Sequence, residues 1–305
     1  MTGPRAPQWR RCAELADAAG DALAGTAPPA SRWLLIEHPG SWSRKALDAP
    51  GLDPAAVAAV TAWAGPADAR IVLIRRPGPR VRDTASRQWF LVDARPGREA
   101  IRTGEFHDAR GLAAVPADQG RPFTGPLTLV CAHGRHDACC AVRGRPLVAA
   151  LAAARPETTW ECTHLGGCRF APTAVVLPHG FTFGRVPPAD AAGIVDDYVR
   201  GRLDTRWLRG RSAFPPAVQA AQHHARRATG ACGIDELRPS ALEPAGAGRW
   251  RVEFTDPGCS VLLQEHRTPV DRPLTCAAAA PGQLREFALL DVRTSAPGRS
   301  GDRPD

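Results

Sequence analysis

The sequence predicts an α/β protein in which two β-α-β-β units follow one another and a small β-rich extension ends the chain. Three observations support this. Short apolar runs alternate with helix-like segments, turn residues separate them, and the pattern of the first third returns in the middle third. The expected organisation is an N-terminal α/β domain, a second α/β domain, a β extension and a disordered tail, at residues 1–122, 123–235, 236–293 and 294–305.

The first third is predicted to form a strand, a helix and two further strands. Apolar runs predict strands at residues 31–40, 69–78 and 88–95. Residues 53–65 begin with Asp-Pro and end with Gly, a pattern typical of a helix.

The middle third repeats this order and adds a final helix. Strands are expected at residues 126–130 and 158–165, and a hairpin that turns at His179-Gly180 is expected from residues 173–186. The predicted helices are residues 140–154 and 187–203. A thioredoxin-like domain requires this β-α-β-β-α order. Because the first third shows a similar order without the cysteines, it is expected to be a degenerate duplicate of the same unit.

The last third is predicted to contain a helix and three strands. Residues 212–230 have helical composition. The strands are expected at residues 248–256, 259–267 and 284–293.

Composition argues against several classes of function. No apolar run is long enough to span a membrane, and the N-terminus has no apolar core that could act as a secretory signal, so a cytoplasmic protein is expected. The formal charge is +8, but the arginines are spread along the chain beside acidic neighbours. Nucleic-acid binding usually gathers basic residues on one face with aromatic platforms, so it is not expected here.

Nine cysteines in a chain expected in the reducing cytoplasm favour metal or redox chemistry over disulfides. Four of them, Cys12, Cys232, Cys259 and Cys276, are scattered, and Cys259 and Cys276 lie in strand-like contexts that suggest core positions. The other five gather in one region of the middle third: Cys131, Cys139, Cys140, Cys162 and Cys168. This region is therefore the candidate site.

Two short motifs carry the chemistry. CAHGRHDACC runs from Cys131 to Cys140, and HLGGC runs from His164 to Cys168. Two pairs of soft ligands on neighbouring loops can hold one small inorganic centre, and imidazole can replace thiolate on one iron of an iron-sulfur cluster. The two glycines of the second motif would let the backbone turn tightly and present N–H groups to the sulfides.

The segments CAHGRHDACCAVRGRP and ECTHLGGCRFAPTAVVLPHGFTFGRV together resemble the sucrase/ferredoxin-like proteins, a branch of the thioredoxin-like 2Fe-2S ferredoxins. The resemblance covers residues 30–230 and is strongest over 126–186. It implies a single 2Fe-2S cluster held by Cys131, Cys140 and His164, with Cys168 at a fourth position where some members have histidine. It also implies electron transfer with a protein redox partner, and places no residue in a catalytic role.

Several alternatives remain open at this point. Cys139 could replace Cys140 as a ligand, and Cys162 could be a ligand instead of a core residue. A thiol-disulfide oxidoreductase using Cys139 and Cys140 is a second function, although the usual C-x-x-C is absent. A structural zinc site with the same four ligands is a third, although the first pair is more widely spaced than in zinc knuckles. The sequence does not indicate whether two chains associate.

Overall fold

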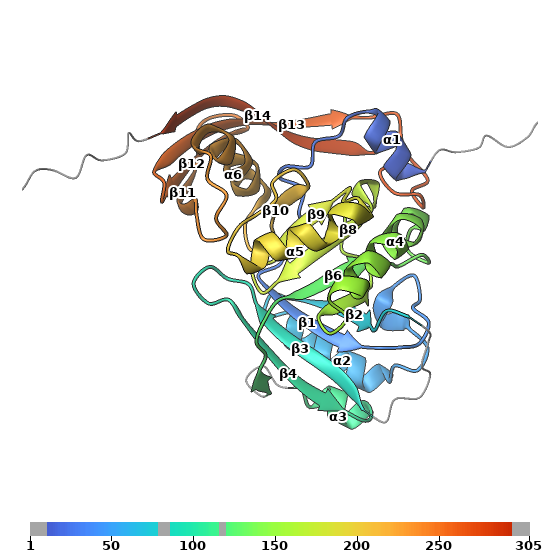
Figure 1. Ribbon diagram of the computed structural model, residues 1–305. Helices are drawn as coiled ribbons and strands as arrows, with labels where there is room; N and C mark the ends of the chain where they lie inside the picture. The colour runs from blue at the N-terminus through green and yellow to red at the C-terminus, as the bar shows by residue number, and fades with distance from the viewer. Residues whose placement is uncertain (1–10, 79–85, 116–119, 295–305) are drawn as a thin grey trace, which may run out of the picture.

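The computed structural model describes residues 11–78, 86–115 and 120–294. The described chain forms a ten-stranded mixed sheet and a separate four-stranded antiparallel sheet (Figure 1). The strands of the large sheet lie in the order β10-β9-β8-β6-β7-β2-β1-β3-β4-β5. The tail expected at residues 294–305 lies outside the described residues except for Thr294, which ends the last strand.

The first half of the large sheet is built from residues 32–122. It comprises β1 (Arg32–Glu37), α2 (Pro54–Ala64), β2 (Ala69–Arg75), β3 (Arg87–Asp93), β4 (Ala100–Phe106), α3 (Ala109–Ala113) and β5 (Arg121–Pro122). A short 3-10 turn, Ala46–Asp48, lies between β1 and α2.

The second half is built from residues 127–211. It comprises β6 (Leu127–Cys131), α4 (Ala138–Ala154), β7 (Thr159–Cys162), β8 (Thr173–Leu177), β9 (Phe181–Gly184), α5 (Ala191–Val199) and β10 (Leu208–Arg211). Two 3-10 turns, Cys168–Phe170 and Pro188–Asp190, precede β8 and α5.

The two halves share one topology, as the predicted duplication requires. In the first half β1 pairs with β2 in parallel and with β3 in antiparallel, and β3 continues to β4. In the second half β6 pairs in the same way with β7 and β8, and β8 continues to β9. The halves join where β2 and β7 run antiparallel, with Ile74 opposite Cys162. The α/β prediction is thus confirmed, and one sheet continues through both units.

Strand residues alternate between two buried faces of this sheet. Leu34 and Ile36 pack with α2 and α3 on one face, and Val130 and Val176 pack with α4 and α5. The intervening residues form a core on the opposite face that runs through both halves and includes Trp33, Leu35, Leu129, Trp160 and Val175. Because both faces are covered, the strands are nearly continuous apolar runs.

The C-terminal sheet contains β11 (Arg238–Pro244), β12 (Arg249–Thr255), β13 (Cys259–Pro269) and β14 (Gln283–Thr294). The helix α6 (Pro216–Thr229), which the sequence placed with the second domain, packs on this sheet through a core that includes Val218, Ala221, Val252 and Val261. The domain boundaries proposed from the sequence stay a prediction. The hairpin of β13 and β14 reaches across the molecule toward α1 (Cys12–Ala18) (Figure 1).

Elements with weak apolar periodicity were not predicted from the sequence: α1, β4, α3, β5, β10 and β11. The strand β4 has the sequence AIRTGEF, in which polar residues and a glycine hide the alternation. The helix expected at 187–203 is shorter, because Pro188–Asp190 forms a 3-10 turn before α5. The strand expected at 158–165 ends at Cys162, where the chain turns into the candidate site.

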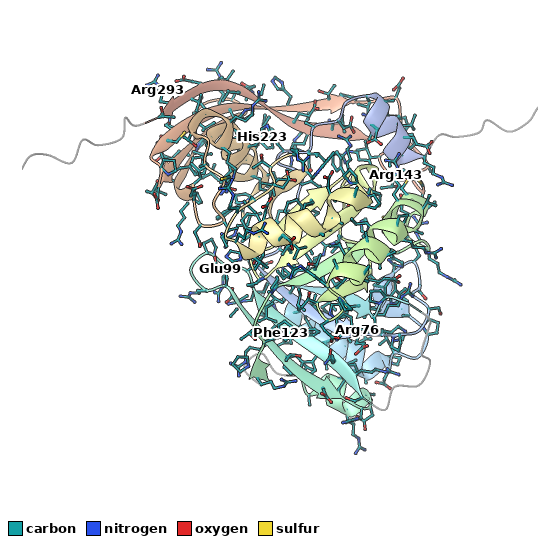
Figure 2. All side chains as sticks on the ribbon, viewed as in Figure 1. Arg76, Glu99, Phe123, Arg143, His223 and Arg293 are labelled. Atoms are coloured by element: carbon teal, nitrogen blue, oxygen red, sulfur yellow. The ribbon has the colours of Figure 1, made fainter. Side chains whose placement is uncertain are left out.

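A largely buried ion pair joins the two halves through the loop between β3 and β4. The guanidinium of Arg211 on β10 donates to the carboxylate of Glu99, which precedes β4, and the two side chains are 4% and 14% exposed. Glu99 is labelled in Figure 2. Burial would raise the pKa of Glu99, but hydrogen bonds from the backbone and from Arg211 hold it below its usual value. The pair therefore stabilises the protein above the ordinary glutamate pKa, and this contribution is lost as pH falls through the lowered value.

We expect Glu99→Gln to reduce the free energy of unfolding by about 3 kcal/mol at neutral pH, since it leaves a buried guanidinium without its counter-charge. Urea unfolding at neutral and acidic pH measures this, and the difference from the unsubstituted protein should shrink in acid. Glu105→Gln, on the exposed side of β4, is the matched control and should have little effect. Equal unfolding curves for Glu99→Gln and the unsubstituted protein at neutral pH would contradict the prediction.

Candidate functional site

The first motif lies where β6 passes into α4. The strand ends at Cys131, and Asp137 caps the helix because its Oδ1 accepts a hydrogen bond of 2.8 Å from the backbone N–H of Cys139. Cys139 and Cys140 therefore occupy the first helical turn. Gly144 brings this helix against the end of β6, since a Cβ there would lie 2.2 Å from the carbonyl oxygen of Cys131.

The second motif is a tight loop after β7. Gly166 and Gly167 have φ angles of 90° and 73°, a region that side chains other than glycine rarely adopt. A Cβ on Gly166 would lie 2.4 Å from Pro28, and one on Gly167 would lie 2.3 Å from the guanidinium of Arg209. The glycines thus make the tight turn that the sequence predicted, and the following 3-10 turn begins at Cys168.

These two loops bring all four predicted ligands together. The ligand atoms of Cys131, Cys140 and His164 lie within 4.8 Å of one another. Cys168 Sγ is 3.4 Å from His164 Nδ1 and also lies within 4.8 Å of Cys140 Sγ. The three cysteines are buried, while His164 is half-buried. Three thiols and one imidazole therefore lie together, with Cys140 and His164 between Cys131 and Cys168, and their role as ligands stays a prediction.

Hydrogen bonds among these groups set their protonation. Contact with Cys140 and His164 holds the pKa of Cys131 well below its usual value, against the effect of burial. The same two neighbours lower the pKa of Cys168. Burial would lower the pKa of His164, but hydrogen bonding with Cys131 and Cys168 raises it to about 9. The pKa of Cys140 is raised, because it is the donor between two thiolates. A metal that took up this set would therefore release the protons of Cys140 and His164.

Two other histidines of the first loop hold His164 in place. His133 Nε2 is 2.8 Å from the carbonyl oxygen of Ser43, and its Nδ1 accepts a hydrogen bond of 3.3 Å from the backbone N–H of His164. The ring of His136 stacks on that of His164 with centroids 3.7 Å apart. Ser43 lies in the segment between β1 and α2, so the first half of the chain also contributes to the orientation of His164.

The alternative ligands lie apart from this set. Cys139 turns away from Cys140, and its Sγ lies 3.6 Å from Cys12 Sγ and 3.4 Å from Cys276 Sγ. Cys162 is opposite Cys131 in the β6–β7 register and belongs to the apolar core, where burial raises its pKa. Within the described residues, Cys162 joins no group of three or more potential metal ligands.

One cysteine prediction is wrong. Cys276 was expected to be a core residue in a strand, but it is exposed and lies in the turn region between β13 and β14. The apolar run after Cys276 resembles a strand, yet prolines at 273 and 281 flank it and prevent regular pairing. Cys259, in contrast, is buried in β13 as expected.

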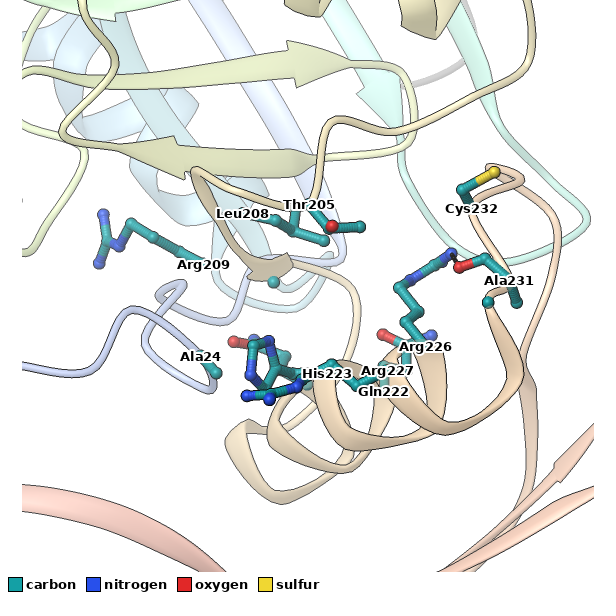
Figure 3. A pocket seen from close by; sticks show the side chains of 13 residues that line it. Ala24, Thr205, Leu208, Arg209, Gln222, His223, Arg226, Arg227, Ala231 and Cys232 are labelled. Atoms are coloured by element: carbon teal, nitrogen blue, oxygen red, sulfur yellow. Dashed lines mark hydrogen bonds between the residues drawn. The ribbon is translucent and has the colours of Figure 1, made fainter. Parts of the chain in front are cut away.

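Buried Arg209 and half-buried Arg70 frame the second loop, and no sequence pattern indicated either of them. Arg209, which is 1% exposed, donates to the carbonyl oxygen of Gly166 at 2.9 Å and to Thr26 Oγ1 at 3.0 Å, and burial lowers its pKa to about 9. Arg70 donates to the carbonyl oxygen of His164 at 2.7 Å. Figure 3 shows the Arg209 side chain directed away from His223, which lines a cavity of about 240 Å³ beside α6.

The family model described as sucrase/ferredoxin-like matches residues 23–210 of the chain. Two solved structures are similar to part of it, both cysteine-to-serine variants of the thioredoxin-like [2Fe-2S] ferredoxin from Aquifex aeolicus. They share 21% and 20% sequence identity with TM-scores of 0.25 and 0.24, and each match covers 28% of this chain and 97% of the ferredoxin chain. None of the curated proteins compared with the chain matches it. Among the described residues, no helix is long and apolar enough to cross a membrane.

Proposed function

Because the chain belongs to the sucrase/ferredoxin-like family, we propose that Cys131, Cys140, His164 and Cys168 hold one 2Fe-2S cluster and that the protein transfers electrons through it. The convergence of three thiols and one imidazole from two adjacent loops carries this proposal. Such a cluster accepts and returns a single electron.

The residues present fit this group. Thiolates are the usual ligands of iron-sulfur clusters, and imidazole replaces thiolate on one iron in Rieske centres. The positive charges of buried Arg209 and half-buried Arg70, which both donate to carbonyl oxygens of the second loop, would offset the negative charge that three thiolates bring. The burial of Cys131, Cys140 and Cys168 also disfavours thiol-disulfide exchange with another protein, which needs an accessible thiolate.

An acidic protein is the proposed redox partner, and the cytoplasm is the proposed location. His164, Gly166 and Gly167 are half-buried, so one edge of the site reaches the surface. A cavity of about 420 Å³ next to Gly167 is lined by four arginines, Arg169, Arg209, Arg267 and Arg285, although Arg169 is paired with Asp21 and Arg267 with Glu265. Complementary charge would speed the encounter with an acidic partner. Arg143, which is labelled in Figure 2, contributes less for the same reason, because it is paired with Asp17 of α1.

Anaerobic isolation tests the proposal directly. We expect a coloured protein with about two irons and two sulfides per chain and an EPR signal that appears on reduction. A colourless protein that holds zinc on the same four residues would establish the structural zinc alternative and overturn the proposal. A disulfide between any two of the three cysteines in the isolated protein would also overturn it.

The reduction potential should lie between that of all-cysteine plant-type clusters, about −400 mV, and the Rieske range of about −150 to +300 mV. It should fall as pH rises, because reduction favours protonation of the imidazole nitrogen that does not bind iron. Protein-film voltammetry across a wide pH range measures both. A pH-independent potential, or one in the upper Rieske range, would contradict the ligand set.

Arg209→Gln should shift the potential of the loaded protein to more negative values. A buried positive charge stabilises the reduced, more negative cluster, and its removal makes reduction harder. Arg206→Gln is the matched control, since its side chain is 63% exposed and solvent screens its charge. Equal potentials for the two variants would show that Arg209 has only a structural role.

A further inference from the structure

A second cluster of thiols lies outside the proposed iron-sulfur site. It unites Cys12 on α1, Cys139 in the first turn of α4 and Cys276 from the turn region between β13 and β14. The Sγ atoms of Cys12 and Cys139 are 3.6 Å apart, those of Cys139 and Cys276 are 3.4 Å apart, and those of Cys276 and Cys12 are 3.5 Å apart. Three regions that are far apart in the sequence therefore meet in a nearly equilateral triangle of sulfurs.

The size of this triangle fits one metal ion. A zinc ion about 2.3 Å from each of several tetrahedral thiolates holds their sulfurs about 3.8 Å apart. A disulfide needs about 2.05 Å between sulfurs. In a four-iron cluster each thiolate binds a different iron, which spreads the sulfurs more widely. The observed spacing is therefore closest to that of a mononuclear thiolate site.

Asp137 supplies an oxygen at the fourth position. Its carboxylate lies within 4.8 Å of all three sulfurs, and Oδ2 is 3.6 Å from Cys12 Sγ. The same carboxylate accepts hydrogen bonds from the backbone N–H groups of Cys139 at 2.8 Å and Cys276 at 2.7 Å, which fix its position. Cys12, Cys139 and Asp137 are buried, and Cys276 borders a cavity of about 410 Å³ through which an ion could enter.

We propose that Cys12, Cys139, Cys276 and Asp137 bind one zinc ion in a structural site that fastens α1 and the C-terminal hairpin to the start of α4. Soft thiolates with one carboxylate oxygen in a closed tetrahedral set favour zinc among the common divalent metals. The site shares no residue with the four proposed for the cluster, but it adjoins them, since the carboxylate of Asp137 also lies within 4.8 Å of the sulfurs of Cys140 and Cys168.

Metal analysis of the intact protein, produced in zinc-supplemented medium, tests this proposal. We expect about one zinc per chain, and zinc X-ray absorption should show a sulfur shell near 2.3 Å with one oxygen at about 2.0–2.2 Å. Cys276→Ser should lose the zinc while its iron content and visible spectrum stay unchanged. Cys232→Ser is the matched control, because Cys232 belongs to no group of potential ligands in the described chain, and it should keep both metals.

A second variant keeps the test decisive if Cys276→Ser folds poorly. Cys12→Ser should show the same selective loss of zinc, and a chelator should lower the Tm of the unsubstituted protein but not that of a variant that has lost the ion. Absence of zinc from the unsubstituted protein, its retention in both variants, or a disulfide between any two of the three cysteines would overturn the site. Zinc lost from Cys140→Ser but kept by Cys276→Ser would overturn both this site and the proposed iron-sulfur centre.

Discussion

Cys140→Ser should abolish the visible absorption of the protein and remove its iron. Cys140 lies within 4.8 Å of both Cys131 and Cys168, so its thiol is the central donor of the proposed cluster site. A serine hydroxyl is a harder and far weaker ligand for iron than a thiolate. Iron analysis and the absorption spectrum of anaerobically purified protein measure the effect.

The adjacent residue is the matched control for this substitution. Cys139 is in the same helical turn and is equally buried, but its Sγ faces Cys12 and Cys276. Cys139→Ser should therefore keep the visible spectrum and lose only the zinc of the second site. If Cys139→Ser bleached the protein and Cys140→Ser did not, the assignment of the first pair of ligands would be reversed.

Gly144→Ala should destabilise the protein by about 2 kcal/mol and lower its iron content. In an ordinary helix this substitution stabilises, because alanine has the higher helix propensity. Here a Cβ would lie 2.2 Å from the carbonyl oxygen of Cys131, so α4 and β6 would have to separate. The movement would shift Cys140 relative to Cys131. Urea unfolding and iron analysis of the purified variant measure the two effects.

Gly193→Ala, which also replaces a glycine within a helix, should have the opposite effect on stability to Gly144→Ala. Gly193 is exposed in α5, and a Cβ there would meet nothing within 4 Å. This variant should gain up to about 1 kcal/mol of stability and keep all its iron. A Gly144→Ala variant as stable as the unsubstituted protein would show that the close approach of α4 to β6 can relax without cost.

The strongly apolar segments allowed most of the large sheet to be predicted. TLV before Cys131 and AVVL after Thr173 are continuous apolar runs because the sheet is covered on both faces. The order of strands and helices then followed from turn residues. The edge strand β10, with the sequence LRGR, carries no such pattern, since its arginines serve buried polar contacts.

The candidate site could be predicted only for residues that lie in short motifs after neighbouring strands. Cys131, Cys140, His164 and Cys168 lie on two loops that follow neighbouring parallel strands, so the topology brings them together. The thiol triangle could not be found in this way, because Cys12 and Cys276 are far from Cys139 in the sequence and only tertiary packing unites them. Arg209 was missed for the same reason, since nothing in LRGR indicates that its guanidinium is buried beside Gly167.

The pairing of β2 with β7 determines whether this protein can be divided into two separate halves. The half without the cysteines fills the neighbouring place in the sheet, and its Ser43 carbonyl orients the histidine loop of the other half. Cutting the chain between the repeats would expose Ile74 and Cys162 along a newly opened strand edge. The half that lacks the cysteine motifs thus covers the β7 edge of the half that carries them, and separating the two would leave that edge unpaired.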